Sequence, residues 1–253
     1  MVPAVTPDAI LALCDGAPGE YAPCLATDAD GTLWRGDVGD ALFHHVLASG
    51  ELTPEGRERL LEGALRWLGA LPTDRSDTGL GGALMARWLA GAIPVGDFCG
   101  LQAALCGGRS EASLRALVNT VASAHVGQHR AEVVELLRQA RAQGLAVRVV
   151  TASLRVVVEA ALDAAGVPYD SVSGVELARE GDRVLPALDG EVPVFHGKVQ
   201  RLQALGAWPP VLGLGDGEWD QGFLQGAWVA LLVHPKPALT RALGAHPRVV
   251  RWG

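Results

Sequence analysis

The sequence lacks several features that would mark large classes of protein. No apolar run approaches the roughly 18 residues that a membrane-spanning helix needs. No block of five like charges occurs, and the net charge of −7 gives no general attraction to nucleic acid or anionic membrane. The first eight residues lack the basic and apolar segments of a signal peptide. We therefore expect a cytoplasmic protein that binds neither nucleic acid nor membrane.

Cysteine is also scarce, and its spacing does not suit a metal or redox site. The four cysteines are Cys14, Cys24, Cys99 and Cys106, and no two of them are separated by only two residues. A chain of 253 residues, of which 49% are apolar, can bury a core without disulfides. We expect reduced, packed thiols, in one large domain or in a core domain with a smaller insertion.

Short apolar runs that stop at polar clusters are present at intervals along the chain. Each run is bounded by turn residues and does not alternate with polar residues, which is typical of strands buried on both faces of a parallel sheet. The runs cover residues 24–27, 145–150, 211–214 and 227–233. Residues 249–252 are a candidate for a last edge strand, and residues 6–15 for a helix before the first strand.

The segment between the first two runs has a different pattern, with apolar residues at helical spacing. Thr53 followed by Pro54 is a typical helix start. The expected helices cover residues 38–49, 54–68, 80–90, 95–105 and 111–124, and strand–helix alternation resumes with helices at 131–143 and 154–165. The order predicts an α/β fold, a doubly wound parallel sheet formed by residues 1–35 and 128–253, with an all-helical insertion at 36–127.

The polar clusters follow the expected strands, where an open parallel sheet binds its ligands. Asp28 and Asp30 can supply a nucleophile and an acid/base. Thr151, with the backbone of Ala152, can hold a phosphate oxygen at a helix start. Taken singly, such residues are often a solvated turn or a helix cap, a role open to Ser153.

Two further clusters complete this set. The acids of Gly215-Asp216-Gly217-Glu218-Trp219-Asp220 suit a hard cation bound through oxygen. Lys198 begins an expected helix, where a lysine is usually exposed, but an inward lysine would offset clustered carboxylates and bind phosphate. Together the clusters provide every group that phosphoryl transfer requires.

With these residues the sequence resembles the haloacid dehalogenase superfamily. Asp28-Ala29-Asp30-Gly31-Thr32-Leu33 matches its D-x-D-G-T-L loop, and residues 215–220 match its G-D-x-x-x-D motif. Thr151 and Gly197-Lys198 match its two intermediate motifs. The resemblance spans residues 24–233 and implies a Rossmann-like core. The helical insertion is similar to a C1-type cap, and the phosphoserine phosphatase-like branch is the nearest.

The resemblance implies a role for each site residue. Asp28 would be the nucleophile and Asp30 the acid/base, with Thr32, Thr151, Ala152 and Lys198 around the phosphoryl group. Asp28, Asp216 and the Asp30 carbonyl would bind Mg²⁺, with Asp220 as a further ligand or as the residue that orients a metal-bound water. On the cap side, Asp37 and Arg87 would contact the leaving group, and Trp34, His44 and His45 lie nearby in the sequence.

The expected function is Mg²⁺-dependent hydrolysis of a small phosphorylated metabolite through an aspartyl-phosphate. Dehalogenases of this superfamily need no acid two residues after the nucleophile, so Asp30 favours phosphate chemistry. Two alternatives remain open: a phosphomutase or phosphotransferase on the same core, and a non-catalytic binding protein of the same fold. The sequence indicates neither which metabolite is the substrate nor the oligomeric state.

Overall fold

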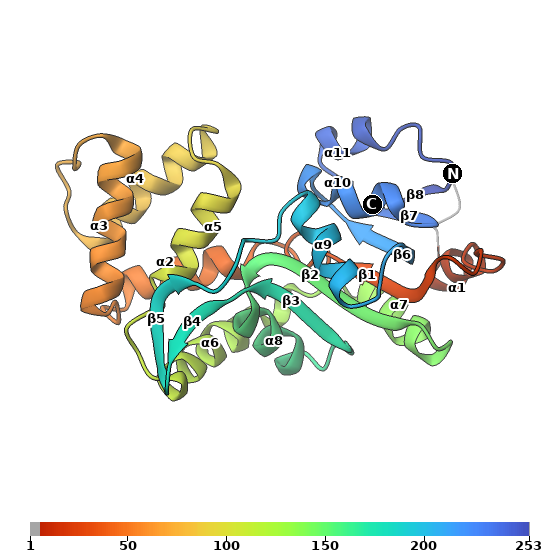
Figure 1. Cartoon of the computed structure of the whole chain (residues 1–253), viewed down its shortest axis with the longest axis horizontal. Coiled ribbons are helices and arrows are strands. Elements are labelled where there is room, and N and C mark those ends of the chain that lie inside the picture. The colour runs from red at the N-terminus through yellow and green to blue at the C-terminus, as the bar shows by residue number, and fades with distance from the viewer. Residues whose placement is uncertain (1–5, 253) are drawn as a thin grey trace.

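A computed structural model describes residues 6–252, so residues 1–5, which include most of the segment examined for a targeting signal, lie outside the described part, as does residue 253. A sheet of six parallel strands, in the order β3-β2-β1-β6-β7-β8, forms the centre of the molecule (Figure 1). Its strands are β1 (Ala22–Thr27), β2 (Ala146–Leu154), β3 (Ser171–Val175), β6 (Pro210–Gly215), β7 (Val229–Val233) and β8 (Val249–Trp252). The prediction of a doubly wound parallel sheet is confirmed, and the 249–252 tail is its edge strand.

Successive strand residues contribute to separate hydrophobic cores on the two faces of the sheet. Leu231 packs in one core and Leu232 in the other, as the two-residue period of a strand requires. The first face is covered by α1 (Pro7–Ala12), α7 (Ala131–Ala142) and α8 (Arg155–Ala164), and the second by α9 (His196–Ala204), α10 (Gln221–Gly226) and α11 (Pro237–Ala242) (Figure 1).

The insertion after β1 is helical, as predicted. It contains α2 (Val38–Ala48), α3 (Pro54–Leu68), α4 (Asp77–Leu89), α5 (Val95–Ala104) and α6 (Glu111–His125), followed by the 3-10 turn η1 (Val126–Gln128). The hydroxyls of Thr53, Ser76 and Ser110 each accept the amide N–H three residues further on, which fixes the starts of α3, α4 and α6. Ser76 moves the start of α4 from the expected residue 80 back to Asp77.

A hairpin that the sequence analysis did not anticipate lies against these helices. Its antiparallel strands are β4 (Leu177–Glu180) and β5 (Arg183–Leu188), and β5 contacts α3, α5 and α6. A Cβ on Gly107 would lie 2.3 Å from the backbone of Pro186, so glycine is needed there for the hairpin to pack. The helix α6 also packs against α8, so the insertion is joined to the sheet region over a broad area.

The end of β2 differs from the expectation in a way that affects the site. The strand continues past Thr151 to Leu154, with an irregular register against β3 after Val150. Ser153 does not cap α8, because the cap position is Leu154 and no side chain bonds there. The four cysteines are unpaired. Within residues 6–252, no helix combines the length and the apolarity needed to cross a bilayer.

Candidate active site

Asp28 is the first residue after β1, at the carboxyl edge of the sheet. Its backbone N–H donates to the carbonyl of Leu214 at 3.0 Å, which continues the β1–β6 ladder by one residue. Its side chain is therefore carried by the centre of a rigid sheet, and one of its oxygens, Oδ1, accepts a hydrogen bond from Lys198 Nζ at 2.6 Å. The position follows from the sheet order, in which β1 is an inner strand.

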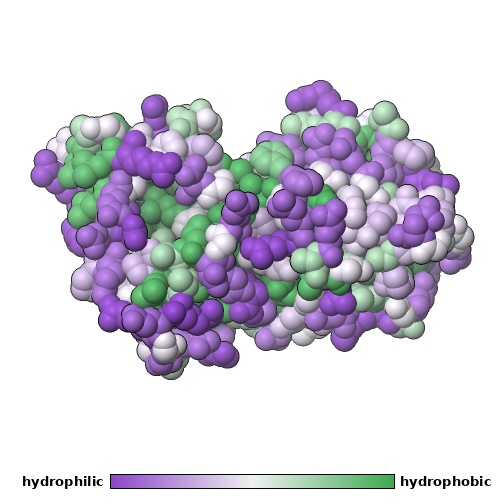
Figure 2. Space-filling model, viewed as in Figure 1, coloured by the Kyte–Doolittle hydropathy of each residue, from purple (hydrophilic) through white to green (hydrophobic). Residues whose placement is uncertain are grey.

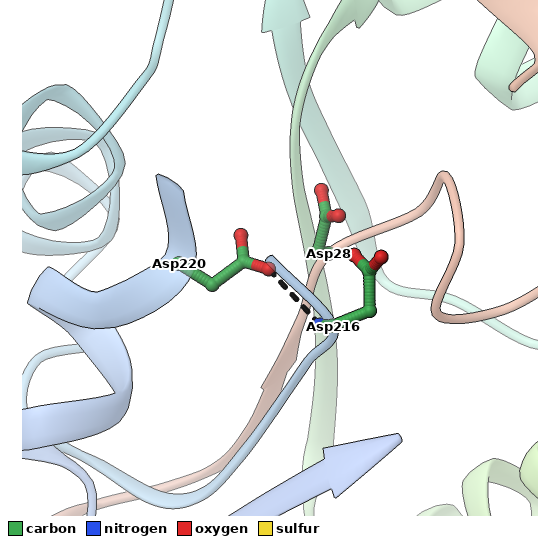
Figure 3. A group of neighbouring side chains, drawn as sticks. All are labelled: Asp28, Asp216 and Asp220. Atoms are coloured by element: carbon green, nitrogen blue, oxygen red, sulfur yellow. Dashed lines mark hydrogen bonds between the residues drawn. The ribbon is translucent and has the colours of Figure 1, made fainter. Parts of the chain in front are cut away.

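Three buried carboxylates converge at this edge (Figure 3). Asp28, Asp216 and Asp220 each offer an oxygen within 4.8 Å of the others. Asp216 and Asp220 come from the loop after β6 and from the 3-10 turn η2 (Glu218–Asp220). A Cβ on Gly31 would lie 2.4 Å from Asp216 Oδ2, so a larger residue at this position would displace the Asp216 carboxylate.

Lys198 is the buried cation of the cluster, with only 2% of its surface exposed. Its ammonium lies 2.6 Å from Asp28 Oδ1 and 2.6 Å from Asp220 Oδ1. Burial lowers the pKa of Lys198, but the charges of Asp220 and Asp28 outweigh it, so the net shift is upward. The other oxygen of Asp220 accepts the backbone N–H groups of Asp216 and Gly217 at 3.1 and 3.2 Å. Asp220 therefore orients both Lys198 and the acidic loop.

The environment of the other two acids of the cluster, Asp28 and Asp216, disfavours their ionised forms. Burial, followed by the charge of Asp220, raises the pKa of Asp28 well above its ordinary range. The pKa of Asp216 is also raised, first by burial, although Lys236 Nζ lies 3.1 Å from its Oδ2 and lowers it in part. A positive charge bound among these oxygens would relieve both shifts.

Asp30 is fixed by three donors. Its Oδ1 accepts the indole N–H of Trp34 at 2.8 Å and the backbone N–H of Val38 at 2.7 Å, and its Oδ2 accepts the hydroxyl of Ser153 at 2.7 Å. Trp34 is fully buried, with its ring edge-to-face against His125 and His129. The side chain of Asp30 is therefore held at the cavity in one orientation.

The predicted phosphate-binding residues divide into two groups. Thr151, Ala152 and Lys198 line the same cavity as Asp28, and the Thr151 oxygen accepts the Ser153 N–H at 3.0 Å, which leaves its hydroxyl proton to donate. Thr32 is different, because its side chain is fully buried and does not line the cavity. The structure therefore does not bring the Thr32 side chain to a phosphate position.

The cavity has a volume of about 350 Å³ and lies between the sheet edge and the inserted helices. Asp37 lines it and also caps α2 by accepting the N–H of Asp40 at 2.8 Å. Arg87 does not line it: its side chain is exposed on α4, and the next residues, Trp88 and Leu89, face the cavity instead. His44 and His45 are also outside the lining.

Several lining residues were not identified from sequence. Asp40, Gln102, Cys99 and Val95 come from α2 and α5, where nothing in the local pattern separates them from other helical residues. Lys236 did carry a signal, because it lies three residues after β7, at the edge where the other polar clusters follow strands. Trp34 was expected near the cap, but its hydrogen bond to Asp30 could not be predicted.

The donor set fits Mg²⁺. Asp28 Oδ2 and Asp216 Oδ1 have no protein partner within residues 6–252, and no hydrogen bond reaches the Asp30 carbonyl in that range. Mg²⁺ uses oxygen ligands and retains several waters, so one or two carboxylates suffice. The side chain of Asp30 is already occupied by Trp34, Val38 and Ser153 and would not be a ligand.

Comparisons with known proteins agree with this geometry. A model of the haloacid dehalogenase-like hydrolase family matches residues 25–225, so the chain belongs to this family. No curated protein sequence matches the chain.

Solved structures show the same fold at low sequence identity. A functionally unknown protein from Anaerococcus prevotii is 15% identical, with a TM-score of 0.72 over 95% of this chain and 90% of its own. A phospho-aspartyl intermediate analogue of phosphoserine phosphatase is 13% identical, with a TM-score of 0.53 over 91% and 93%. Cytosolic 5′-nucleotidase IIIB bound to cytidine is 15% identical, with a TM-score of 0.57 over 96% and 83%. The fold is thus shared with the phosphoserine phosphatase-like branch of the superfamily.

Proposed function

We propose that the protein is a Mg²⁺-dependent phosphomonoester hydrolase that acts on a small phosphorylated metabolite through an aspartyl-phosphate. The observation that carries the proposal is the position of Asp28, whose carboxylate is buried beside Lys198 and faces the cavity next to Thr151 and Asp30. The inserted helices, approximately residues 36–127, act as a cap domain that encloses the leaving group.

In the first step, a carboxylate oxygen of Asp28 attacks phosphorus and the bond from phosphorus to the ester oxygen breaks. The Thr151 hydroxyl donates a hydrogen bond to a phosphoryl oxygen, and Lys198 contributes positive charge beside the attacking group. Charge stabilisation of this kind supplies most of the rate enhancement in phosphoryl transfer.

Asp30 gives a proton to the leaving alkoxide in that step and takes one from water in the next. Its Oδ1 already faces two fixed donors, Trp34 Nε1 and Val38 N, so the transferable proton belongs on Oδ2. The Ser153 hydroxyl beside Oδ2 can rotate from donating to accepting, which accommodates both protonation states. The water then attacks phosphorus, the bond to Asp28 breaks, and inorganic phosphate leaves.

Mg²⁺ would be held by Asp28, Asp216 and the Asp30 carbonyl, where it would neutralise phosphate charge and keep the Asp28 carboxylate ionised. Asp220 then serves to position Lys198 and the loop rather than to bind the ion directly.

The test is phosphate release from p-nitrophenyl phosphate with Mg²⁺ and with EDTA, for the wild type and Asp28→Asn. We expect turnover only with Mg²⁺, and a loss of at least about 10³-fold in kcat for the variant, since the nucleophile is removed. Circular dichroism should show an unchanged fold.

Three results would contradict the proposal. Activity that survives Asp28→Asn would exclude this nucleophile. Transfer to an added sugar acceptor without phosphate release would favour a phosphotransferase. Binding of phosphate esters with no turnover in Mg²⁺ would favour a non-catalytic protein.

A further inference from the structure

The charged groups around the cavity are distributed unevenly. Carboxylates come from both the sheet edge and the inserted helices, and they belong to Asp28, Asp30, Asp37, Asp40 and Asp216. The only lining cations within residues 6–252 are Lys198, which is paired with Asp28 and Asp220, and Lys236, which is paired with Asp216. Both lysines come from the sheet side, where the phosphoryl group would bind.

The wall formed by the inserted helices has no cation to offer a leaving group. Its lining residues are Asp37 and Asp40 of the α2 start, Trp88 and Leu89 of α4, and Val95, Cys99 and Gln102 of α5. Arg87, which was expected to contact the leaving group, is exposed elsewhere on α4. A leaving group with a carboxylate would therefore meet Asp37 and Asp40 without a compensating charge.

The acids on this wall, Asp37 and Asp40, are held in place by hydrogen bonds. The Gln102 amide, only 9% exposed, donates from Nε2 to Asp40 Oδ1 at 2.6 Å. No hydrogen bond reaches its Oε1 within the described chain, and the residue lines the cavity, so this carbonyl oxygen is available to a donor on the ligand. Burial, followed by the charges of Asp30 and Asp40, raises the pKa of Asp37, so a bound cation would stabilise its ionised form.

The rest of the wall is apolar and aromatic. Trp88 stacks on Phe98 with ring centroids 4.8 Å apart and planes at 9°, which holds the indole in place. Leu89 and Val95 extend the apolar surface, and Leu89 is 72% exposed, at the cavity rim. An apolar wall with an indole beside carboxylates suits an alkylammonium group, which has a positive charge and little hydrogen-bonding surface beyond it.

We propose that the leaving alcohol carries an ammonium group and no carboxylate, so that the substrate is the phosphomonoester of an amino alcohol. The inference rests on the proposed hydrolase function and assigns Asp40, with Gln102 and Asp37, to recognition of the ammonium. It distinguishes this chain from an enzyme that selects a phosphorylated amino acid.

The experiment compares four esters in Mg²⁺, with kcat/KM as the readout. O-phosphoethanolamine carries the ammonium group. Propyl phosphate has the same shape but a methyl group in place of the ammonium. Phosphoserine adds a carboxylate to the amine, and sn-glycerol 3-phosphate replaces the amine with hydroxyls. We expect phosphoethanolamine to exceed propyl phosphate by at least about tenfold, the usual scale of one charge-assisted hydrogen bond, and phosphoserine to fall below phosphoethanolamine.

Two variants and one control locate the effect. In Asp40→Asn, which keeps an acceptor for Gln102, the ratio of phosphoethanolamine to propyl phosphate should fall about tenfold. In Leu89→Lys, which places a cation at the exposed rim, that ratio should also fall and phosphoserine should improve. The control Glu58→Gln removes a charge from an exposed position of α3 outside the cavity and should leave the ratio unchanged.

The outcomes separate the two proposals. If propyl phosphate or glycerol phosphate is hydrolysed as well as phosphoethanolamine, or if Asp40→Asn leaves the ratio unchanged, the ammonium assignment is overturned while the hydrolase proposal stands. A preference for phosphoserine would overturn it in the same way. If none of the four esters is hydrolysed with Mg²⁺ while p-nitrophenyl phosphate is, only the ammonium assignment fails; if p-nitrophenyl phosphate is not hydrolysed either, both proposals fail.

Discussion

The two walls of the cavity are built on different principles. On the sheet side, the polar side chains bond to one another: Lys198 joins Asp28 to Asp220, and Asp220 in turn holds the backbone of Asp216. On the side of the inserted helices, the wall includes an exposed leucine, an indole and acids that lack a cation. Much of the outer surface in Figure 2 is hydrophilic. Apolar residues are visible in the recess between the inserted helices, on the left, and the sheet region, on the right. Under the proposed function, the sheet side would carry the chemistry and the helical side would select the leaving group.

The largest losses of stability and activity are expected from Lys198→Met on the sheet side, which leaves Asp28 and Asp220 buried without their cation. Loss of one partner of a buried ion pair typically costs about 3–5 kcal/mol, and urea denaturation should show a loss of this size. Activity on p-nitrophenyl phosphate should fall by at least about 100-fold, because the cation beside the nucleophile is gone.

The pH dependence of that variant follows from the raised pKa of Asp28. A carboxyl with a raised pKa in the folded state binds more protons there than when unfolded, so stability falls as pH rises through that range. Lys198 lowers the pKa of Asp28 in part, so its removal should raise that pKa further, and the stability deficit of Lys198→Met should shrink as the pH is lowered from 8 towards 5. Lys236→Met is the matched control, since the Lys236 side chain is 48% exposed and its ion pair with Asp216 should contribute about 1 kcal/mol or less. Equal losses in the two variants would contradict the burial argument.

A smaller effect is expected from Trp34→Phe, which keeps most of the ring packing but removes the N–H that Asp30 Oδ1 accepts. A hydrogen bond to a charged group is worth about 1.5–3 kcal/mol, so kcat should fall about 10- to 100-fold while KM changes little. Steady-state kinetics on p-nitrophenyl phosphate provides the measurement.

Trp67→Phe, at a partly buried indole outside the cavity, is the control for the loss of an indole. An unchanged kcat in Trp34→Phe would show that Asp30 does not depend on this donor for its position.

The smallest effect is expected from Leu89→Ala on the helical wall. Because Leu89 is 72% exposed, thermal denaturation should show a stability change within about 0.5 kcal/mol, while KM for phosphoethanolamine should rise by only about two- to threefold. Leu84→Ala, on the fully buried face of the same helix, should cost about 2–5 kcal/mol. A large loss of stability in Leu89→Ala would show that this wall is part of the core.

The sheet and its edge residues were predictable because the signals are local. A buried parallel strand is a short apolar run, and a polar cluster at its end must lie at the shared edge, which brought Asp28, Thr151 and Asp216 together in the prediction. The burial of Lys198 was not predictable from its own segment, because its partner Asp28 is 170 residues away. Asp40 and Gln102 are 62 residues apart on separate helices, so only their packing reveals the pair.

One element was not anticipated and one local expectation failed, both for physical reasons. β4 has only four residues, two of them charged, and the apolar run of β5 is interrupted by Pro186, which argues against a strand. Ser153 has the identity of a helix cap, but β2 continues through it and its hydroxyl bonds to Asp30 instead. The role of Ser153 is thus determined by the Asp30 carboxylate, which the local sequence around Ser153 does not reveal.

The β4–β5 hairpin also restricts how substrate can enter. The chain leaves the sheet region a second time, after β3, and returns only before α9, with β5 resting on α3, α5 and α6 in the interval. If the inserted helices moved outward as a lid, the hairpin would have to move with them or slide across them. Hinge motion at the two linkers of the insertion is therefore not enough. We expect admission of substrate through small adjustments of the α4–α5 rim rather than through a wide separation of the two parts.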